Sequence, residues 1–259
     1  MLSIYFTSLF LLSVVSAAPI LTERDLNTTV WTAEHVLQPH EALLVGSDGQ
    51  LEVAHVDAYR VFLESQGVRL DAPELDETFQ ELSLGNQEVN LTDYHLNARQ
   101  FSCSRTQVMV MDKTYDFVGW DIQMSPVYGA GDATIRNGYT TNNGVTVNGN
   151  VDLTWAKDVL KTTFGVNYNR QWSSSVDLSY KGTIARGNHG TIITKPRKTR
   201  RIGRVLSGCP GSFTQIGTFQ ADSHITGNYK GIDWVSGSIE LCQKRQFPLT
   251  FCTGSGTFV

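Results

Sequence analysis

The stretches VTVNGNVDLTW (residues 145–155) and FGVNYNRQWSSSVDLSYKGTI (residues 164–184) decide the predicted fold. In the first, apolar or small residues occupy the odd positions and polar residues occupy the even positions. In the second, the alternation returns on the even positions, which include Phe164, Tyr168 and Trp172. Alternation of period two is typical of a strand with one buried and one solvated face. The two stretches therefore predict antiparallel β structure.

Further short strands are predicted downstream, where apolar runs are separated by Gly, Pro and Ser. They cover residues 190–194, 213–219, 225–229 and 234–241. Residues 100–259 form a chain long enough for one sizeable core. We therefore expect an all-β body over residues 100–259, either an antiparallel sandwich or a barrel-like sheet.

Residues 18–99 differ from this body in charge. They contain 15 Asp and Glu against 4 Arg, whereas residues 100–259 contain 10 acidic residues against 17 Lys and Arg. An acidic segment before a basic domain is typical of a propeptide that covers the domain during secretion. We expect cleavage after Arg99, which follows Leu-Asn-Ala.

This propeptide is itself expected to be a small α+β unit. Residues 42–45 and 50–53 flank Gly-Ser-Asp-Gly and predict a hairpin. Apolar residues at helical spacing over 56–63, followed by Gly67, predict a helix. The acidic stretch 70–90 shows little periodicity, which is typical of a linker.

Residues 1–17 are predicted to be a signal peptide, removed after Ala17. The apolar run 4–15 is about a dozen residues long, short of the roughly 20 that span a bilayer, and ends in a small-residue site. A membrane anchor is the alternative. We expect a secreted, extracellular protein, and the sequons at Asn27 and Asn90 predict a glycoprotein.

All four cysteines lie in the body: Cys103, Cys209, Cys242 and Cys252. An even number in an oxidising compartment predicts two disulfides and leaves three pairings open. We favour Cys242 with Cys252, which closes a short loop, and Cys103 with Cys209. A metal site is the alternative, but no two cysteines have zinc-knuckle spacing. No metal or cofactor is predicted.

The run KPRKTRRIGR (residues 195–204) holds six cations: Lys195, Arg197, Lys198, Arg200, Arg201 and Arg204. Pro196 and Gly203 bracket the run as loop residues would, which predicts a solvated loop. Alternatively the run binds an anionic lipid, an acidic polysaccharide or another anionic partner. Nucleic acid is not expected, because no aromatic platform accompanies the charge.

Enzymatic residues are sparse. A ribonuclease would need His189, His224 and Glu240 to converge, and a glycosidase would need two carboxylates such as Asp112, Asp116 or Asp121 across a cleft. No nucleophile elbow, metalloprotease or phosphate-loop motif occurs. We therefore predict no catalytic residues and keep a secreted hydrolase or ribonuclease as a third hypothesis.

The alternating stretch also fits a membrane-inserting hairpin. Transmembrane strands need about 9 to 11 residues with alternating apolar and polar side chains, and residues 145–184 supply two such arms. Arg170 on the apolar stripe opposes insertion, at a cost of about 2–4 kcal/mol near the bilayer midplane. An ordinary half-buried sheet produces the same alternation and is the stronger interpretation.

Several segments resemble secreted effector-like proteins of filamentous fungi. They are GCPGS (208–212), ADSH (221–224), WVSGSI (234–239) with Cys242, CTGSG (252–256) and the propeptide-like ending LNARQ (96–100). The resemblance implies a β-rich, disulfide-bonded body delivered toward a host, and it implies no catalytic residues. We expect non-enzymatic binding of a host protein or cell-wall component that modulates defence or induces cell death. A β-pore-forming toxin is the alternative.

Overall fold

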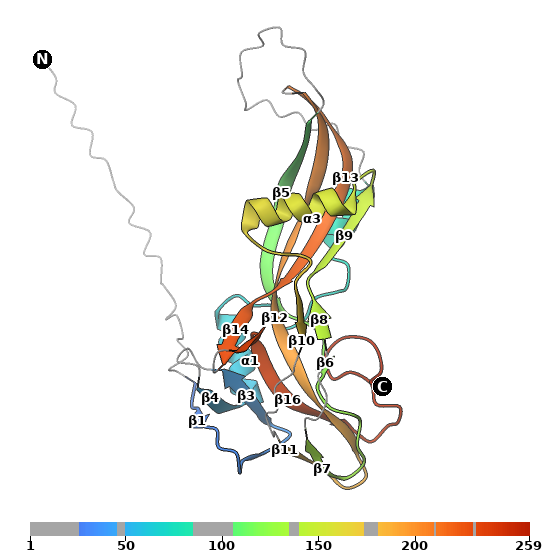
Figure 1. Ribbon diagram of the computed structural model, residues 1–259. Helices are drawn as coiled ribbons and strands as arrows, with labels where there is room; N and C mark the ends of the chain where they lie inside the picture. The colour runs from blue at the N-terminus through green and yellow to red at the C-terminus, as the bar shows by residue number, and fades with distance from the viewer. Residues whose placement is uncertain are drawn as a thin grey trace, which may run out of the picture.

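A computed structural model describes residues 26–45, 50–84, 106–134, 140–173, 181–209, 211–229 and 232–259. The body is built around one long strand, β12 (His189–Cys209). Antiparallel neighbours flank it, namely β5 (Thr106–Val118), β13 (Ser212–His224) and β16 (Gly237–Lys244). In Figure 1, β5, β12 and β13 run side by side along one elongated arm, while β16 lies beside the other end of β12.

The remaining body strands are short: β6 (Ile122–Gln123), β7 (Gly131–Thr134), β8 (Thr140–Asn142), β9 (Gly144–Gly149), β10 (Gln171–Ser173), β11 (Lys181–Ile184), β14 (Thr226–Tyr229) and β15 (Ile232–Val235). β9 pairs with the outer side of β13, and β8 pairs with β10. β7 pairs with β11, and β14 pairs with β15. The body is therefore all-β with antiparallel pairing, as predicted.

The first half of β12 pairs with β16 and β6, and the second half lies between β5 and β13. The basic run is the middle of this strand, so the prediction of a solvated loop is wrong. Pro196 and Gly203 both lie inside the strand. Gly203 is needed there because a Cβ atom would collide with the carbonyl of Val110 and the ring of Phe219. At this point β5 and the Phe219 side chain of β13 approach the backbone of β12 too closely for a side chain.

The stretch 145–184 does not form two long strands. The first stretch forms β9 and then the start of α3 (Leu153–Phe164). The second stretch forms only the short strands β10 and β11 among the described residues, and residues 174–180 lie outside them. The Asp152 carboxylate caps α3 by accepting from the backbone N–H of Trp155 at 2.7 Å. Gly165 ends the helix in the left-handed conformation, at φ +68°. These two capping signals outweigh the alternation.

Three of the four shorter predicted strands are confirmed, because 190–194 lies in β12, 213–219 in β13 and most of 225–229 in β14. The fourth, 234–241, is divided at Ser236 between the end of β15 and the start of β16. The predicted hairpin before the body is also confirmed: it consists of β3 (Glu41–Val45) and β4 (Leu51–His55). The predicted helix is α1 (Val56–Ser65), followed by Gly67 at φ +73°.

The predicted linker is partly wrong. Residues 77–84 of that stretch form the helix α2 (Glu77–Leu84), while 85–90 lie outside the described residues. β1 (Thr29–Val30) and β2 (Val36–Leu37) complete a small α+β unit ahead of the body. Within the described parts of the chain, no helix is long and apolar enough to cross a membrane.

The leader, residues 26–84 as described here, is joined to the body by strand pairing. β3 pairs with β16, so the hairpin extends the body sheet, and β2 pairs in parallel with β11. The leader core under α1 includes Tyr59, Phe62 and Leu63, and Val118 is the body residue that packs into it. Separate clusters fill the body, one of them between α3 and the sheet.

Candidate functional site

The cations of β12 are mostly paired with groups of the same chain. Buried Lys195 donates from Nζ to Oε2 of Glu240 at 2.6 Å, and Glu240 also accepts from Ser238 at 2.7 Å. Arg201 donates to Ser223 at 3.0 Å and lies over the ring of Phe164. This part of the predicted anion-binding run is therefore engaged within the fold.

Arg204 and Arg200 each hold a carboxylate by two hydrogen bonds. Arg204 pairs with Asp112 near the surface, at 2.6 and 3.0 Å. Arg200 pairs with Asp222 at 2.7 Å for both bonds, and only 2% of Arg200 is exposed. Arg200 also donates to the backbone carbonyl of Pro73, so it links the body sheet to the leader.

A cleft of about 180 Å³ opens beside Arg200, between the sheet and the leader. Its walls are Ala72, Pro73, Glu74, Phe117, Trp120, Lys198, Arg200 and Asp222. The Trp120 indole donates to the carbonyl of Ala72 at 3.3 Å. Burial lowers the pKa of Lys198 and outweighs the opposing effect of the Asp222 charge. The cleft thus presents cationic and aromatic side chains beside the leader backbone.

Residues 71–84, called the strap hereafter, cross the sheet face next to this cleft. The strap is the non-helical segment 71–76 followed by α2. Asp76 is the strap residue held most tightly: it is 2% exposed and accepts from Lys113 at 2.9 Å and Tyr115 at 2.6 Å. Further along, Ser83 contacts the hydroxyl of Thr218 at 2.7 Å.

The carboxyl group of Asp76 makes the stability of the folded chain depend on pH. Burial alone would raise its pKa, but hydrogen bonds from Tyr115 and Lys113 outweigh burial and hold the pKa well below its usual range. A depressed carboxyl pKa contributes stability that is present above the unfolded pKa of about 4 and is lost as the pH falls below it.

We expect Asp76→Asn to lower the urea midpoint at pH 7, because the carboxylate partners of Lys113 and Tyr115 are lost. The difference from the native chain should shrink steadily from pH 5 to pH 2. Urea unfolding at several pH values measures it. A difference that is constant over this range would show that the Asp76 charge does not hold the strap.

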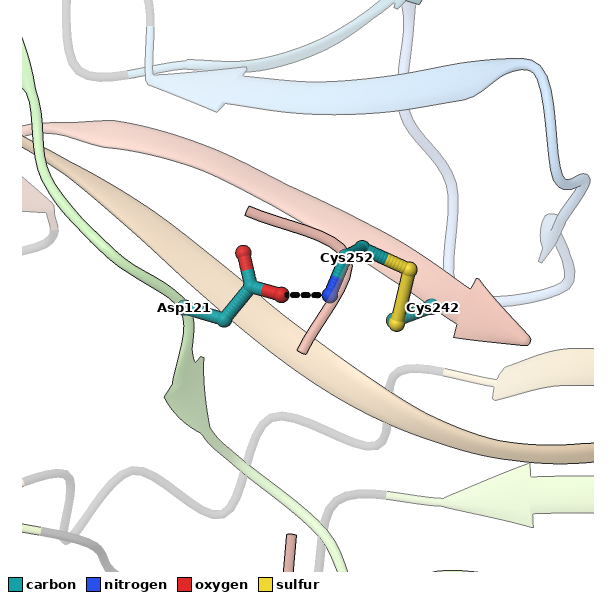
Figure 2. A group of neighbouring side chains, drawn as sticks. All are labelled: Asp121, Cys242 and Cys252. Carbon is teal, nitrogen blue, oxygen red and sulfur yellow. Dashed lines mark hydrogen bonds between the residues drawn. A yellow bond between two sulfur atoms is a disulfide. The ribbon is translucent and has the colours of Figure 1, made fainter. Parts of the chain in front are cut away.

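The predicted disulfide between Cys242 and Cys252 is confirmed. Cys209 is also disulfide-bonded, and its predicted partner Cys103 lies outside the described residues. Figure 2 shows Asp121 beside the first disulfide, with its carboxylate directed at the backbone nitrogen of Cys252. Burial raises the pKa of Asp121. The possible ligand atoms of Asp121, Cys242 and Cys252 lie within 4.8 Å of one another. The two sulfur atoms are bonded to each other, however, so they offer no thiolate to a metal.

The catalytic candidates do not converge. His189 lies opposite Lys244 at the start of β12, whereas His224 lies opposite Lys198, farther along the same strand. At roughly 3.3 Å per residue, this separation is about 30 Å. Burial, together with the charge of Lys198, lowers the pKa of His224 to about 3. His224 is therefore a neutral, buried ring at physiological pH.

The carboxylates proposed for glycosidase chemistry are also dispersed. Asp112 is paired with Arg204, and Asp116 accepts from the hydroxyl of Thr199 at 2.6 Å. Asp121 lies beyond the end of β5, at the disulfide. These side chains have structural partners instead of facing each other across a cleft.

The segment from β8 to β10 lies at the edge of the sheet, and α3 covers one face of β9 and β13 (Figure 1). Two α3 side chains, Ala156 and Leu160, are fully buried. Two large apolar side chains at the ends of α3 are not: Leu153 is 41% exposed and Phe164 is 38% exposed. The helix is thus held through a narrow buried stripe.

The processing residues Ala17 and Arg99 and the sequon residue Asn90 lie outside the described residues, while Asn27 is exposed. Sequence reasoning missed the strap network altogether. Its only signal was the acidic composition of the stretch containing Asp76, which suggested a linker.

Comparisons with known proteins identify no family. No family model and no curated protein matches the chain. One solved structure is similar in part, a protein described as "Putative pore-forming toxin from Bacteroides vulgatus". The identity is 13%, the match covers 54% of this chain and 52% of that one, and the TM-score is 0.17. The chain therefore matches about half of that structure, and at this TM-score nothing about function follows.

Proposed function

We propose that this protein acts on membranes, and that residues 145–184 convert from their folded arrangement into a membrane-inserting β-hairpin. The observation that carries the proposal is a conflict between pattern and fold. The sequence alternates as two amphipathic strands, yet the folded chain uses much of it as α3 and short strands. Such a conflict between local pattern and native structure is typical of functional segments.

The position of the segment supports this conversion. Among the described strands, β9 lies at the edge of the sheet and pairs only with β13, so its departure would leave β12 and its other neighbours paired. The hairpin arms would be residues 145–155 and a similar length that begins at Phe164, with the turn between them. Each arm has the 9 to 11 residues, approximately, that a tilted transmembrane strand requires.

Exposed apolar side chains provide the second support. Leu153 and Phe164 belong to the apolar stripes of the two arms and are partly solvated in the folded protein. Burying their exposed parts in lipid would be favourable by roughly 1 kcal/mol for each side chain, a fraction of the about 1.5–3 kcal/mol for a fully exposed one. Arg170 opposes insertion, but its cost falls to about 0–1 kcal/mol when it lies near the headgroups.

We expect the purified protein to release a trapped dye from liposomes. The full chain should be tested both intact and after cleavage between residues 85 and 105, because the leader packs on the body sheet. Release should rise steeply with protein concentration if several copies form the pore. Liposomes that stay sealed in the presence of both forms would refute membrane action.

A second function, binding of a host component by a secreted effector, stays a prediction. The cleft lined by Phe117, Trp120 and Lys198 favours it, since cationic and aromatic side chains together suit an anionic ligand. Binding to the host followed by membrane action would combine both hypotheses. Binding of the protein to host tissue under conditions that leave liposomes intact would favour the effector alone.

A further inference from the structure

The sheet face beneath the strap contacts the strap backbone in the way a protein contacts a bound peptide. The side-chain amide of Gln220 donates to the carbonyl of Glu74 at 2.7 Å and accepts from the N–H of Asp76 at 2.8 Å. One amide group thus satisfies both a carbonyl and an N–H of the strap. Hydrogen bonds to backbone groups are independent of the strap side chains.

Arg200 extends the same pattern. Its guanidinium donates to the carbonyls of Pro73 and Glu74, at 2.6 and 3.3 Å, while Asp222 fixes its orientation. The Trp120 indole donates to the preceding carbonyl, that of Ala72. Body side chains therefore donate hydrogen bonds to three successive carbonyls of the strap, those of Ala72, Pro73 and Glu74.

One position on this face binds a strap side chain instead of the strap backbone. There the carboxylate of Asp76 accepts hydrogen bonds from the ammonium group of Lys113 and the hydroxyl of Tyr115. A buried carboxylate with two charge-assisted or short hydrogen bonds is strongly preferred there over a neutral or cationic group. The face thus combines backbone recognition with one acidic specificity position.

The strap is held mainly by these polar contacts. Ala72 and Phe79 are buried, but no strap residue belongs to the hydrophobic clusters found among the described residues. Leu75 is partly exposed and Leu84 is almost fully exposed. The strap is therefore attached as a peptide ligand is, by hydrogen bonds and charge, while the rest of the leader shares its core with the body.

We propose that this sheet face is a binding groove for a short acidic peptide of another protein, and that the strap occupies it in the free molecule. The peptide carries an Asp at the position of Asp76, with its preceding carbonyls on Gln220, Arg200 and Trp120. The proposal is independent of membrane action. It predicts that an acidic peptide binds when the strap is displaced.

A labelled peptide with the sequence of residues 71–84 tests this in a fluorescence anisotropy titration. The full chain carrying Asp76→Lys places a cation against Lys113 and should release the strap. We expect this variant to bind the native peptide at least about tenfold more tightly than the native chain does. The same peptide carrying Asp76→Lys should bind this variant at least about tenfold more weakly than the native peptide.

Glu81→Lys is the matched control, because it makes the same charge change at an exposed strap residue. A chain with Glu81→Lys should exclude the peptide as the native chain does. If Asp76→Lys does not fold, as judged by near-ultraviolet circular dichroism, the isosteric Asp76→Asn replaces it. The proposal is overturned if the folded Asp76 variant does not bind the native peptide. It is also overturned if that variant binds the native peptide and the Asp76→Lys peptide equally well.

Discussion

Leu153→Lys will reduce dye release by at least about tenfold while leaving the folded protein nearly as stable as before. Leu153 is 41% exposed at the first turn of α3, so a charge there meets water in the folded state. In the proposed hairpin the same side chain would face lipid, where Lys costs about 2–4 kcal/mol near the midplane. A cost of about 1.4 kcal/mol already corresponds to a factor of ten.

Thr154→Lys is the matched control for this variant. Thr154 is also exposed and lies in the same helical turn, so both substitutions have a similar effect on the folded state. In a strand, adjacent side chains point to opposite faces, and position 154 faces the aqueous interior of a pore. Dye release should therefore survive Thr154→Lys. Equal losses in both variants would exclude a strand conformation at this point.

Arg200→Ala will lower the free energy of unfolding by about 3–5 kcal/mol. The substitution leaves Asp222 without its bidentate partner and removes the donors to the carbonyls of Pro73 and Glu74. Breaking a buried ion pair has this effect because the remaining charge stays desolvated. Urea unfolding followed by tryptophan fluorescence measures it.

Arg204→Ala provides the comparison on the same strand. Arg204 also makes two hydrogen bonds to one carboxylate, that of Asp112, but the side chains of both Arg204 and Asp112 are partly solvated. Its loss should cost about 1 kcal/mol or less. A similar destabilisation in both variants would show that burial and the strap contacts add nothing to the Arg200 pair.

Local signals explain the successful sequence predictions. The hairpin of β3 and β4 and the strands of the body have alternation and turn residues close together in the chain. Helix α3 was missed because alternation extends through Leu153 and Trp155. The capping residues Asp152 and Gly165 could have identified it, since they bracket a stretch of helical length.

Long-range partners explain the failures. The basic run has the composition of a loop, but Arg200 and Arg204 find carboxylates on β13 and β5 and become part of the central strand. The strap has the composition of a linker, yet its contacts with the body join residues 35 to 146 positions apart. Pairings at such separations leave no local pattern from which the groove could be inferred.

The pairing of β3 with β16 has a consequence for how copies of this protein meet. Residues 238–240 of β16 direct their outer backbone groups to β3, so the leader closes that edge of the body sheet. An uncovered edge strand offers a row of N–H and C=O groups to any other strand. Loss of the leader would therefore expose the backbone groups of this edge to pairing with a strand of another copy, whereas the folded leader keeps them covered.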